Sequence, residues 1–182
     1  SETLSLAEVK AHLSELVGRV DRQHDRVTVT VHGRPSAVLL SPDDLEALEE
    51  TIAILSDEAA VRQLTASDTE LARGEGESEQ ALAEAMLGAG ELRDRERYEL
   101  VVAPTARRQL TEILPESVAF AAYDFIVGPL LDNPHRVGKQ LRPPLADRHS
   151  ARRGTYRVIY RIDDERHRVT VVGVVHRADA YR

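Results

Sequence analysis

The sequence of 182 residues predicts an α+β protein with two structured parts. Residues 4–55 show the order helix, hairpin, helix, and residues 98–182 show a strand, a helical hairpin and an antiparallel sheet. Between them, residues 56–97 are rich in acidic side chains and poor in apolar ones. We therefore expect an N-terminal domain over residues 1–55, a tail or linker over residues 56–97 and a C-terminal domain over residues 98–182.

The first domain begins with a helix-and-hairpin pattern. Residues 4–19 carry apolar side chains at helical spacing, with Ser5 as N-cap and Glu8 three residues later, as in a capping box. Residues 26–32 alternate as a strand, and residues 36–40 form a short apolar return strand after the turn at Gly33.

A second helix is predicted over residues 41–55. Ser41 caps it, and Pro42 occupies the first helical position. Fifty-five residues bury little apolar surface alone, so we expect this domain to form a homodimer.

The tail cannot build its own core, and we expect it to be extended or disordered in isolation, with short helices at residues 57–64 and 81–87. Its apolar side chains are possible anchors for grooves of a partner: Leu64, Leu71, Leu82, Met86, Leu87 and Leu92. A flexible linker is the alternative, but 42 residues are long for a connection without a role. We therefore expect residues 56–97 to contact residues 98–182.

The C-terminal domain starts with a strand at residues 98–102 and two helices, residues 105–114 and 116–131, separated by Pro115. Residues 151–182 then read as two antiparallel strands joined by an acidic turn. This gives a helical hairpin packed on an antiparallel sheet.

Charge divides the chain into two halves. Residues 1–97, the acidic half, hold 10 Lys and Arg against 21 Asp and Glu, and residues 98–182, the basic half, hold 14 against 10. Opposite charges suggest that each half is the other's partner, and the cations of the last hairpin suggest a polyanionic ligand.

Several classes of function are disfavoured. Without Cys the chain has no disulfide, thiolate or thiol-based zinc site, which fits a reducing cytoplasm. The histidines lack metal-ligand spacing, and there is no Gly-rich phosphate loop, so we expect neither a metal nor a cofactor. We see no membrane span and no signal peptide, and predict a cytoplasmic protein.

Residues 3–55 resemble the Phd/YefM group of antitoxins, which is RelB-like here. The resemblance rests on the first helix and on VTVTVHGRPSAVLLSPDDLEAL. It implies a dimer that binds operator DNA through this domain, with a tail that wraps a toxin. Lys10 lies at the place of a DNA-contacting basic residue, and His12, His32 and Arg34 are further candidates.

Residues 97–182 resemble the RelE toxins of bacterial type II toxin–antitoxin systems. The motifs are TARRQL, DNPHRVGKQL, HSARRGTYRVIYRIDD and VVHRADAY. The resemblance implies a metal-independent endoribonuclease that cleaves messenger RNA on the ribosome and inhibits translation. It is inhibited while its antitoxin is bound, and the complex represses its own operon.

Metal-free RNA cleavage needs a base, an acid and cations that stabilise the transition state. The resemblance implies that Arg157 stabilises the transition state, that Arg177 holds phosphate, and that Tyr181 acts as base or stacks on the nucleotide. His149 and His176 are candidates for an acid–base pair, because lysines used by some RelE proteins are missing.

RNA-binding candidates are the cations before and at the start of the hairpin: Arg148, Arg152, Arg153, Arg142 and Lys139. Two alternatives stay open: a non-enzymatic gyrase inhibitor like ParE with its antitoxin, or an inactive toxin fold in a DNA-binding repressor. The identity of the general base, the codon preference, the operator, the stoichiometry and covalent fusion in the cell are also open.

Overall fold

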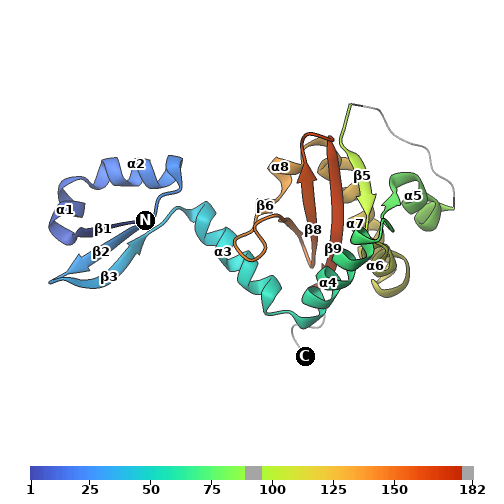
Figure 1. The fold of residues 1–182 in the computed structure, drawn as a ribbon, viewed down its shortest axis with the longest axis horizontal. Coiled ribbons are helices and arrows are strands. Elements are labelled where there is room, and N and C mark those ends of the chain that lie inside the picture. The colour runs from blue at the N-terminus through green and yellow to red at the C-terminus, as the bar shows by residue number, and fades with distance from the viewer. Residues whose placement is uncertain (89–95, 178–182) are drawn as a thin grey trace. The chain divides into compact units, whose positions relative to one another are not determined.

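A computed structural model describes residues 1–88 and 96–177. The chain forms two compact units, residues 1–49 and the residues from Glu50 onward (Figure 1). The division falls inside helix α3 (Pro42–Leu55), so Glu50 and the last turn of α3 belong to the second unit. The predicted α+β class is confirmed.

The first unit is a three-stranded sheet with helices. Strand order is β1-β2-β3, with β1 parallel to β2 and β2 antiparallel to β3. The elements before α3 are β1 (Glu2–Ser5), α1 (Leu6–Ala11), α2 (Leu13–Gln23), β2 (Val27–Val31) and β3 (Arg34–Leu39).

The prediction of one helix over residues 4–19 was wrong at its start and in its middle. The first residues pair with β2 as a parallel strand, and the helix is interrupted at His12. The capping box itself is confirmed, because the Glu8 amide donates to Ser5 Oγ over 3.3 Å and the Ser5 amide donates to Glu8 Oε2 over 2.8 Å. The hydrogen bonds from Ser5 lower the pKa of Glu8. The cap therefore begins α1 directly after β1.

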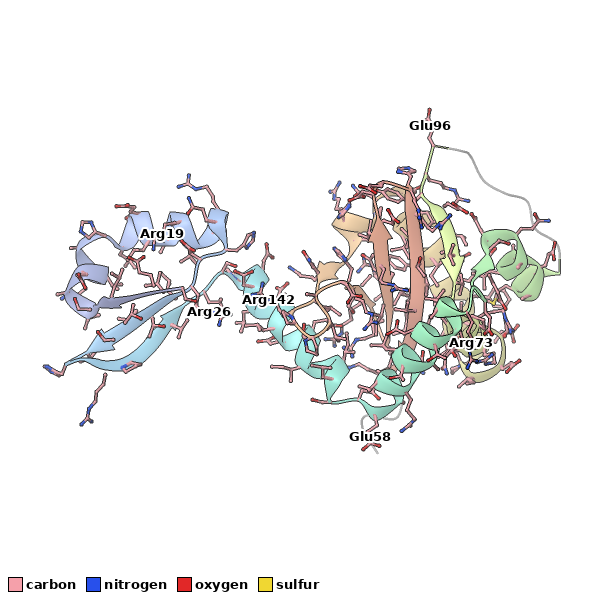
Figure 2. All side chains as sticks on the ribbon, viewed as in Figure 1. Arg19, Arg26, Glu58, Arg73, Glu96 and Arg142 are labelled. Carbon is pink, nitrogen blue, oxygen red and sulfur yellow. The ribbon has the colours of Figure 1, made fainter. Side chains whose placement is uncertain are left out.

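A small apolar core holds the first unit together, and it consists of Val9, Leu16, Val20, Val27 and Val29. Outside this core, Arg19 of α2, which Figure 2 labels, forms ion pairs with Glu2 and, over 3.0 Å, with Asp25. The β2–β3 turn is made by His32 and Gly33, both with positive φ, as a tight two-residue hairpin turn requires.

The second unit contains a six-stranded sheet with the order β4-β5-β9-β8-β7-β6. Its strands are β4 (Glu77–Ser78), β5 (Glu99–Val102), β6 (Lys139–Gln140), β7 (His149–Arg153), β8 (Tyr156–Asp163) and β9 (Arg168–His176). Its helices after α3 are α4 (Glu58–Ala72), α5 (Glu79–Leu87), α6 (Pro104–Arg108), the π-helical turn η1 (Gln109–Ile113), α7 (Glu116–Phe125), the π-helical turn η2 (Ile126–Leu130) and α8 (Pro134–Val137).

The sheet is mixed rather than purely antiparallel. Strands β6 to β9 pair antiparallel as expected, but β5 runs parallel to β9. A parallel pair needs a long crossover, and here the helical hairpin and β6 to β8 supply it. Strand β4 adds an edge from the acidic half by pairing antiparallel with β5.

Helices cover both faces of this sheet (Figure 1). One face carries Tyr156, Val158 and Tyr160 of β8 and packs against α6, α7 and their π-helical turns. The other face carries Ile159, Val172 and Val175 and packs against Ile54 and Leu64 of α3 and α4. The second core is thus built from both halves of the chain.

The segment of residues 56–88 is folded along the basic half. Helix α4 extends for 15 residues, well past the predicted residues 57–64. Leu64 and Leu82 are buried anchors, and Leu71 and Met86 pack at the core margins. Leu87 is exposed and does not act as an anchor here, and Leu92 lies outside the described residues. Contact with the basic half stabilises helical structure in this segment that its weak apolar pattern did not predict.

No helix in the described part of the chain has the length and apolar character needed to cross a membrane.

Candidate functional site

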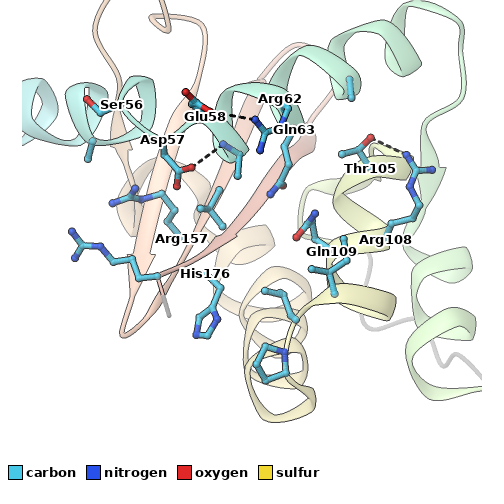
Figure 3. A pocket seen from close by; sticks show the side chains of 18 residues that line it. Ser56, Asp57, Glu58, Arg62, Gln63, Thr105, Arg108, Gln109, Arg157 and His176 are labelled. Carbon is cyan, nitrogen blue, oxygen red and sulfur yellow. Dashed lines mark hydrogen bonds and ion pairs between the residues drawn. The ribbon is translucent and has the colours of Figure 1, made fainter. Parts of the chain in front are cut away.

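A cavity of about 1100 Å³ lies in the second unit (Figure 3). The junction of α3 and α4 forms one wall, and α6 with η1 and the end of β9 form the others. Three of the predicted catalytic side chains line it, namely Arg157, His176 and Arg177. The cavity also takes side chains from the acidic half, including Asp57 and Arg62.

Arg157 is buried, with 4% of its surface exposed. Its Nε lies 2.7 Å from Glu50 Oε1, and its Nη2 donates to Glu50 Oε2 over 3.4 Å. Ser150 Oγ donates to the same Glu50 Oε1 over 2.8 Å. A buried guanidinium requires an anion, and the ion pair with Glu50 of the acidic half supplies it.

Further arginines of the basic half pair with acids of α4 and β4. Arg148 pairs with Asp68, and Arg107 Nε lies 2.7 Å from Glu77. Arg108 Nη2 donates over 3.1 Å to the carboxylate of Glu70.

Glu70 also caps the start of α6. Its Oε1 accepts from the amide of Thr105 over 2.9 Å. Burial acts to raise the pKa of Glu70, but the hydrogen bonds from Thr105 and Arg108 outweigh it, so the pKa is lowered. The carboxylate therefore stays ionised at the contact between the halves, as the charge division predicted.

His176 and Arg177 lie where β9 ends. His176 Nε2 is 3.1 Å from Thr155 Oγ1, and the Arg177 amide donates to the Thr155 carbonyl over 2.7 Å. The β7–β8 turn thus holds the backbone that presents both side chains to the cavity. Tyr181 lies outside the described residues.

His149 is not brought to His176. On β8, His149 pairs with Tyr160 and His176 pairs with Tyr156, so four residues of strand separate them along the sheet. His149 instead stacks on the ring of Tyr160 and meets the edge of His135. Burial, and to a smaller extent the charge of His135, lowers the pKa of His149. The expected acid–base pair of the two histidines is therefore absent from this arrangement.

The predicted RNA-binding cations divide into two groups. Arg152 of β7 pairs with Arg157 of β8 and is exposed, whereas Arg148, which directly precedes β7, is buried. Arg153 lies on the opposite face, 4.8 Å above the Phe125 ring, and donates to the Val137 carbonyl. Alternation along a strand separates side chains that are adjacent in sequence.

The other two cations precede β7. Lys139 lies on β6, and the exposed Arg142 follows it in the connection to β7 (Figure 2).

The four predicted DNA-binding residues are exposed in the first unit. Lys10 lies on α1, His12 lies at the α1–α2 break, and His32 and Arg34 flank the tip of the β2–β3 hairpin. Because Ser5 pairs with Thr30, α1 begins at the same end of the sheet as this tip. The four side chains therefore gather toward one end of the first unit.

Sequence reasoning missed Glu50, Thr51 and Ser150. Thr51 Oγ1 accepts from the amide of Arg142 over 2.9 Å, next to the Glu50 contacts. The sequence could have indicated Ser150, because alternation along the strand places it on the same face as the predicted site residues Arg148 and Arg152. For Glu50 the signal was its i, i+4 spacing to Ile54 on one helix face.

Among the residues that the structure describes, no three His, Asp or Glu side chains come together as a possible metal site.

Comparison with known proteins divides the chain in the same order. Residues 1–74 match the family described as antitoxin Phd_YefM of type II toxin–antitoxin systems, and residues 100–181 match the ParE toxin family of such systems.

Toxin RelE of Mycobacterium tuberculosis is 51% identical over 85 residues, which are 47% of this chain and 87% of that protein. Antitoxin RelB of the same organism is 42% identical over 69 residues, which are 38% of this chain and 78% of that protein. The solved structure of the toxin–antitoxin complex RelBE2 from M. tuberculosis has a chain that is 48% identical, with a TM-score of 0.43 over 44% of this chain and 99% of that chain.

Proposed function

Because the chain belongs to the Phd/YefM antitoxin family in its N-terminal part and to the ParE/RelE toxin family in its C-terminal part, we propose that it is a messenger RNA endoribonuclease joined to its own inhibitor. The basic half cleaves mRNA on the ribosome in the cytoplasm and so inhibits translation. The acidic half neutralises it and represses the operon. The observation that carries this proposal is that Arg157, His176 and Arg177 line one cavity that residues of the acidic half also line.

The proposed chemistry uses no metal. Arg157 stabilises the charge that develops on the scissile phosphate, and Arg177 holds a phosphate oxygen, since a guanidinium matches phosphate geometry. His176 and Tyr181 transfer the protons. They take the place of the acid–base pair of His149 and His176 that the sequence predicted. Arg148 and Arg152 extend the cationic face along β7 toward the RNA backbone.

Neutralisation follows from the position of Glu50. Its carboxylate takes the hydrogen-bond donors of Arg157 and Ser150 that a phosphate would need. A carboxylate and a phosphate oxygen pair compete for the same guanidinium face. While α3 is in place, RNA cannot reach Arg157.

The same proposal assigns DNA binding to the first unit as a homodimer. Lys10, His12, His32 and Arg34 are exposed toward one end of its sheet. Exposed large apolar side chains support a dimer surface, and they include Leu6, Leu13, Val17 and Val38. A Lys10→Ala and Arg34→Ala variant should bind an operator fragment more weakly and with a smaller salt dependence in a gel-shift titration.

The nuclease proposal is tested in a purified translation reaction. Residues 98–182 are produced in the reaction, and breaks in the messenger are mapped by primer extension. We expect cleavage within the decoding site that stops when residues 1–97 are added. An Arg157→Ala and Arg177→Ala variant should not cleave, and cleavage by this variant would refute the assignment.

A second candidate is inhibition of DNA gyrase without catalysis, and it is favoured by the match of residues 100–181 to the ParE toxin family. The same protein is added to a gyrase supercoiling assay. Loss of supercoiling with intact messenger would select this function. Intact messenger with normal supercoiling would leave a DNA-binding repressor with an inert toxin fold.

A further inference from the structure

Strand β9 contains a bulge in its middle. Ile159 of β8 pairs with Gly173, but Tyr160 pairs with Val171, so Val172 has no partner on β8. On the other side of β9, the ladder with β5 ends where Val102 pairs with Val171. Val172 therefore lies beyond the last residue pair between β5 and β9, and it is skipped in the pairing between β8 and β9. Buried backbone groups at such a place need partners from elsewhere.

Helix α4 of the acidic half supplies these partners with two side chains. Ser67 Oγ donates to the Val172 carbonyl over 2.6 Å, and the Val174 amide donates to Gln63 Oε1 over 3.1 Å. Ser67 is completely buried and Gln63 is 8% exposed. The two side chains are four residues apart and lie on one face of the helix. The helix thus satisfies an acceptor and a donor that a further strand would otherwise meet.

Leu64, which lies between Gln63 and Ser67 in the helix, packs against the same part of the strand. It is buried in the second core with Ile159, Val172 and Val175. A Cβ added to Gly173 would lie 3.5 Å from Leu64 Cδ2 and 3.7 Å from Gln63 Oε1. Position 173 therefore has room for little more than a methyl group once α4 is in place. At this point the side chains of α4 reach the backbone of the strand.

We propose that the β9 bulge is the element by which the toxin domain selects its antitoxin helix. The site accepts residues 58–72 because they carry an amide at position 63 and a hydroxyl at position 67, on either side of Leu64 along the helix. The ion pairs of Asp68, Glu70 and Glu77 depend on charge, whereas the bulge requires two uncharged groups at fixed positions. The inference depends on residues 58–72 being the antitoxin segment and not on ribonuclease activity.

The test uses the full chain and the hydrogen exchange of the α4 amides over residues 62–70, measured by NMR. Ser67→Ala and Gln63→Met each remove one bond and leave a buried backbone group without a partner, so each should speed this exchange about tenfold. Thr69→Ala is the matched control, because the Thr69 hydroxyl is exposed and bonds to the Thr65 carbonyl of its own helix. The control should change exchange by less than about threefold. Rates for Ser67→Ala and Gln63→Met equal to the control would refute the role of the bulge.

A reversed pair tests selection directly. Gln63→Ser combined with Ser67→Gln keeps the composition and charge of the helix but exchanges the two groups. We expect about hundredfold faster exchange, as for the loss of both bonds. Exchange as slow as in the unchanged chain would mean that any polar pair suffices, and selection by the bulge would be wrong.

Salt separates the bulge from the ion pairs. In Glu70→Gln the exchange should be faster than in the unchanged chain at low salt, and this difference should shrink in about 1 M salt, where charges are screened. The effect of Ser67→Ala should persist at both concentrations. If it also disappears in high salt, charge alone retains α4 and the proposal fails.

Discussion

The two ends of the β8–β9 hairpin satisfy their charges in opposite ways. At the cavity end, the positive charge of Arg157 is met by Glu50, a residue of the antitoxin part. At the turn end, Asp164 accepts from Tyr98 over 2.7 Å and lies 2.9 Å from His135 Nε2, both of which belong to the toxin domain. The turn end is complete within the toxin domain, whereas the cavity end is complete only with the antitoxin. The antitoxin part therefore supplies the counter-charge at the cavity end, whereas the turn end needs no residue from it.

The largest effect is expected when the cavity end is broken. Glu50→Ala leaves Arg157 buried without a counter-charge and should lower the free energy of unfolding of the second unit by about 3 kcal/mol. Urea denaturation followed by fluorescence or circular dichroism measures this. Glu49→Ala, which removes an exposed neighbouring charge of α3, should cost less than about 0.5 kcal/mol. Equal costs for the two variants would show that the pair does not hold this end.

A smaller effect is expected inside the scaffold. Tyr160 is completely buried, and its hydroxyl donates to the Pro134 carbonyl over 2.6 Å. Burial raises the pKa of this phenol, so it remains a donor throughout the neutral range. Tyr160→Phe should lower the free energy of unfolding by about 1–2 kcal/mol, because a buried carbonyl loses its partner.

Tyr156→Phe is the comparison for that change. Its hydroxyl donates to Ala121 over a longer 3.2 Å in a less buried place. The same urea titration should give a smaller loss, and a larger loss for Tyr156→Phe than for Tyr160→Phe would contradict the ranking.

The pH dependence near His149 should be moderate. Burial lowers its pKa in the folded state, so below about pH 6.5 the unfolded chain takes up a proton that the folded chain resists. The free energy of unfolding should therefore fall as pH decreases from about 7 to 5. His149→Gln should flatten this slope in urea titrations at several pH values, and an unchanged slope would show that His149 does not contribute to it.

The smallest effect is expected at the exposed turn. Hydrogen bonds from His135 and then Tyr98 lower the pKa of Asp164 in the folded state. The stabilisation is present above the unfolded pKa of about 4 and is lost as pH falls through the lowered value. Asp164→Asn should remove this acid-dependent loss below about pH 4. Acid titration followed by circular dichroism compares the two chains, and identical acid transitions would show that the turn contributes nothing.

Local signals predicted those parts of the fold that local chemistry determines. The Ser5 capping box, the helix over residues 41–55 and the β8–β9 hairpin follow from caps, periodicity and turn residues. The parallel pairing of β5 with β9 could not be predicted, because it joins residues about seventy positions apart. The folded length of α4 was also missed, because its order comes from the bulge and apolar contacts of the basic half.

The site was predicted only in part for the same reason. The motifs placed Arg157, His176 and Arg177 together, and the cavity contains all three. His149 lies away from the cavity because of alternation along β7 and a four-residue offset along β8. This position could not be predicted without knowing the strand register. Glu50 was missed because its spacing to Ile54 indicates a shared helix face but not the buried arginine that its carboxylate meets.

The antitoxin helices and the toxin domain are parts of one polypeptide, and this changes how occupancy of the cavity is controlled. Segments joined by a short connection meet at an effective concentration in the millimolar range, whatever the amount of protein in the cell. Dilution, or the synthesis of additional free antitoxin, therefore alters the occupancy very little. Within this chain, occupancy of the cavity depends on the free energy of lifting α3 and α4 from the sheet. A protease or a competing ligand that shifts this opening equilibrium would act as the control.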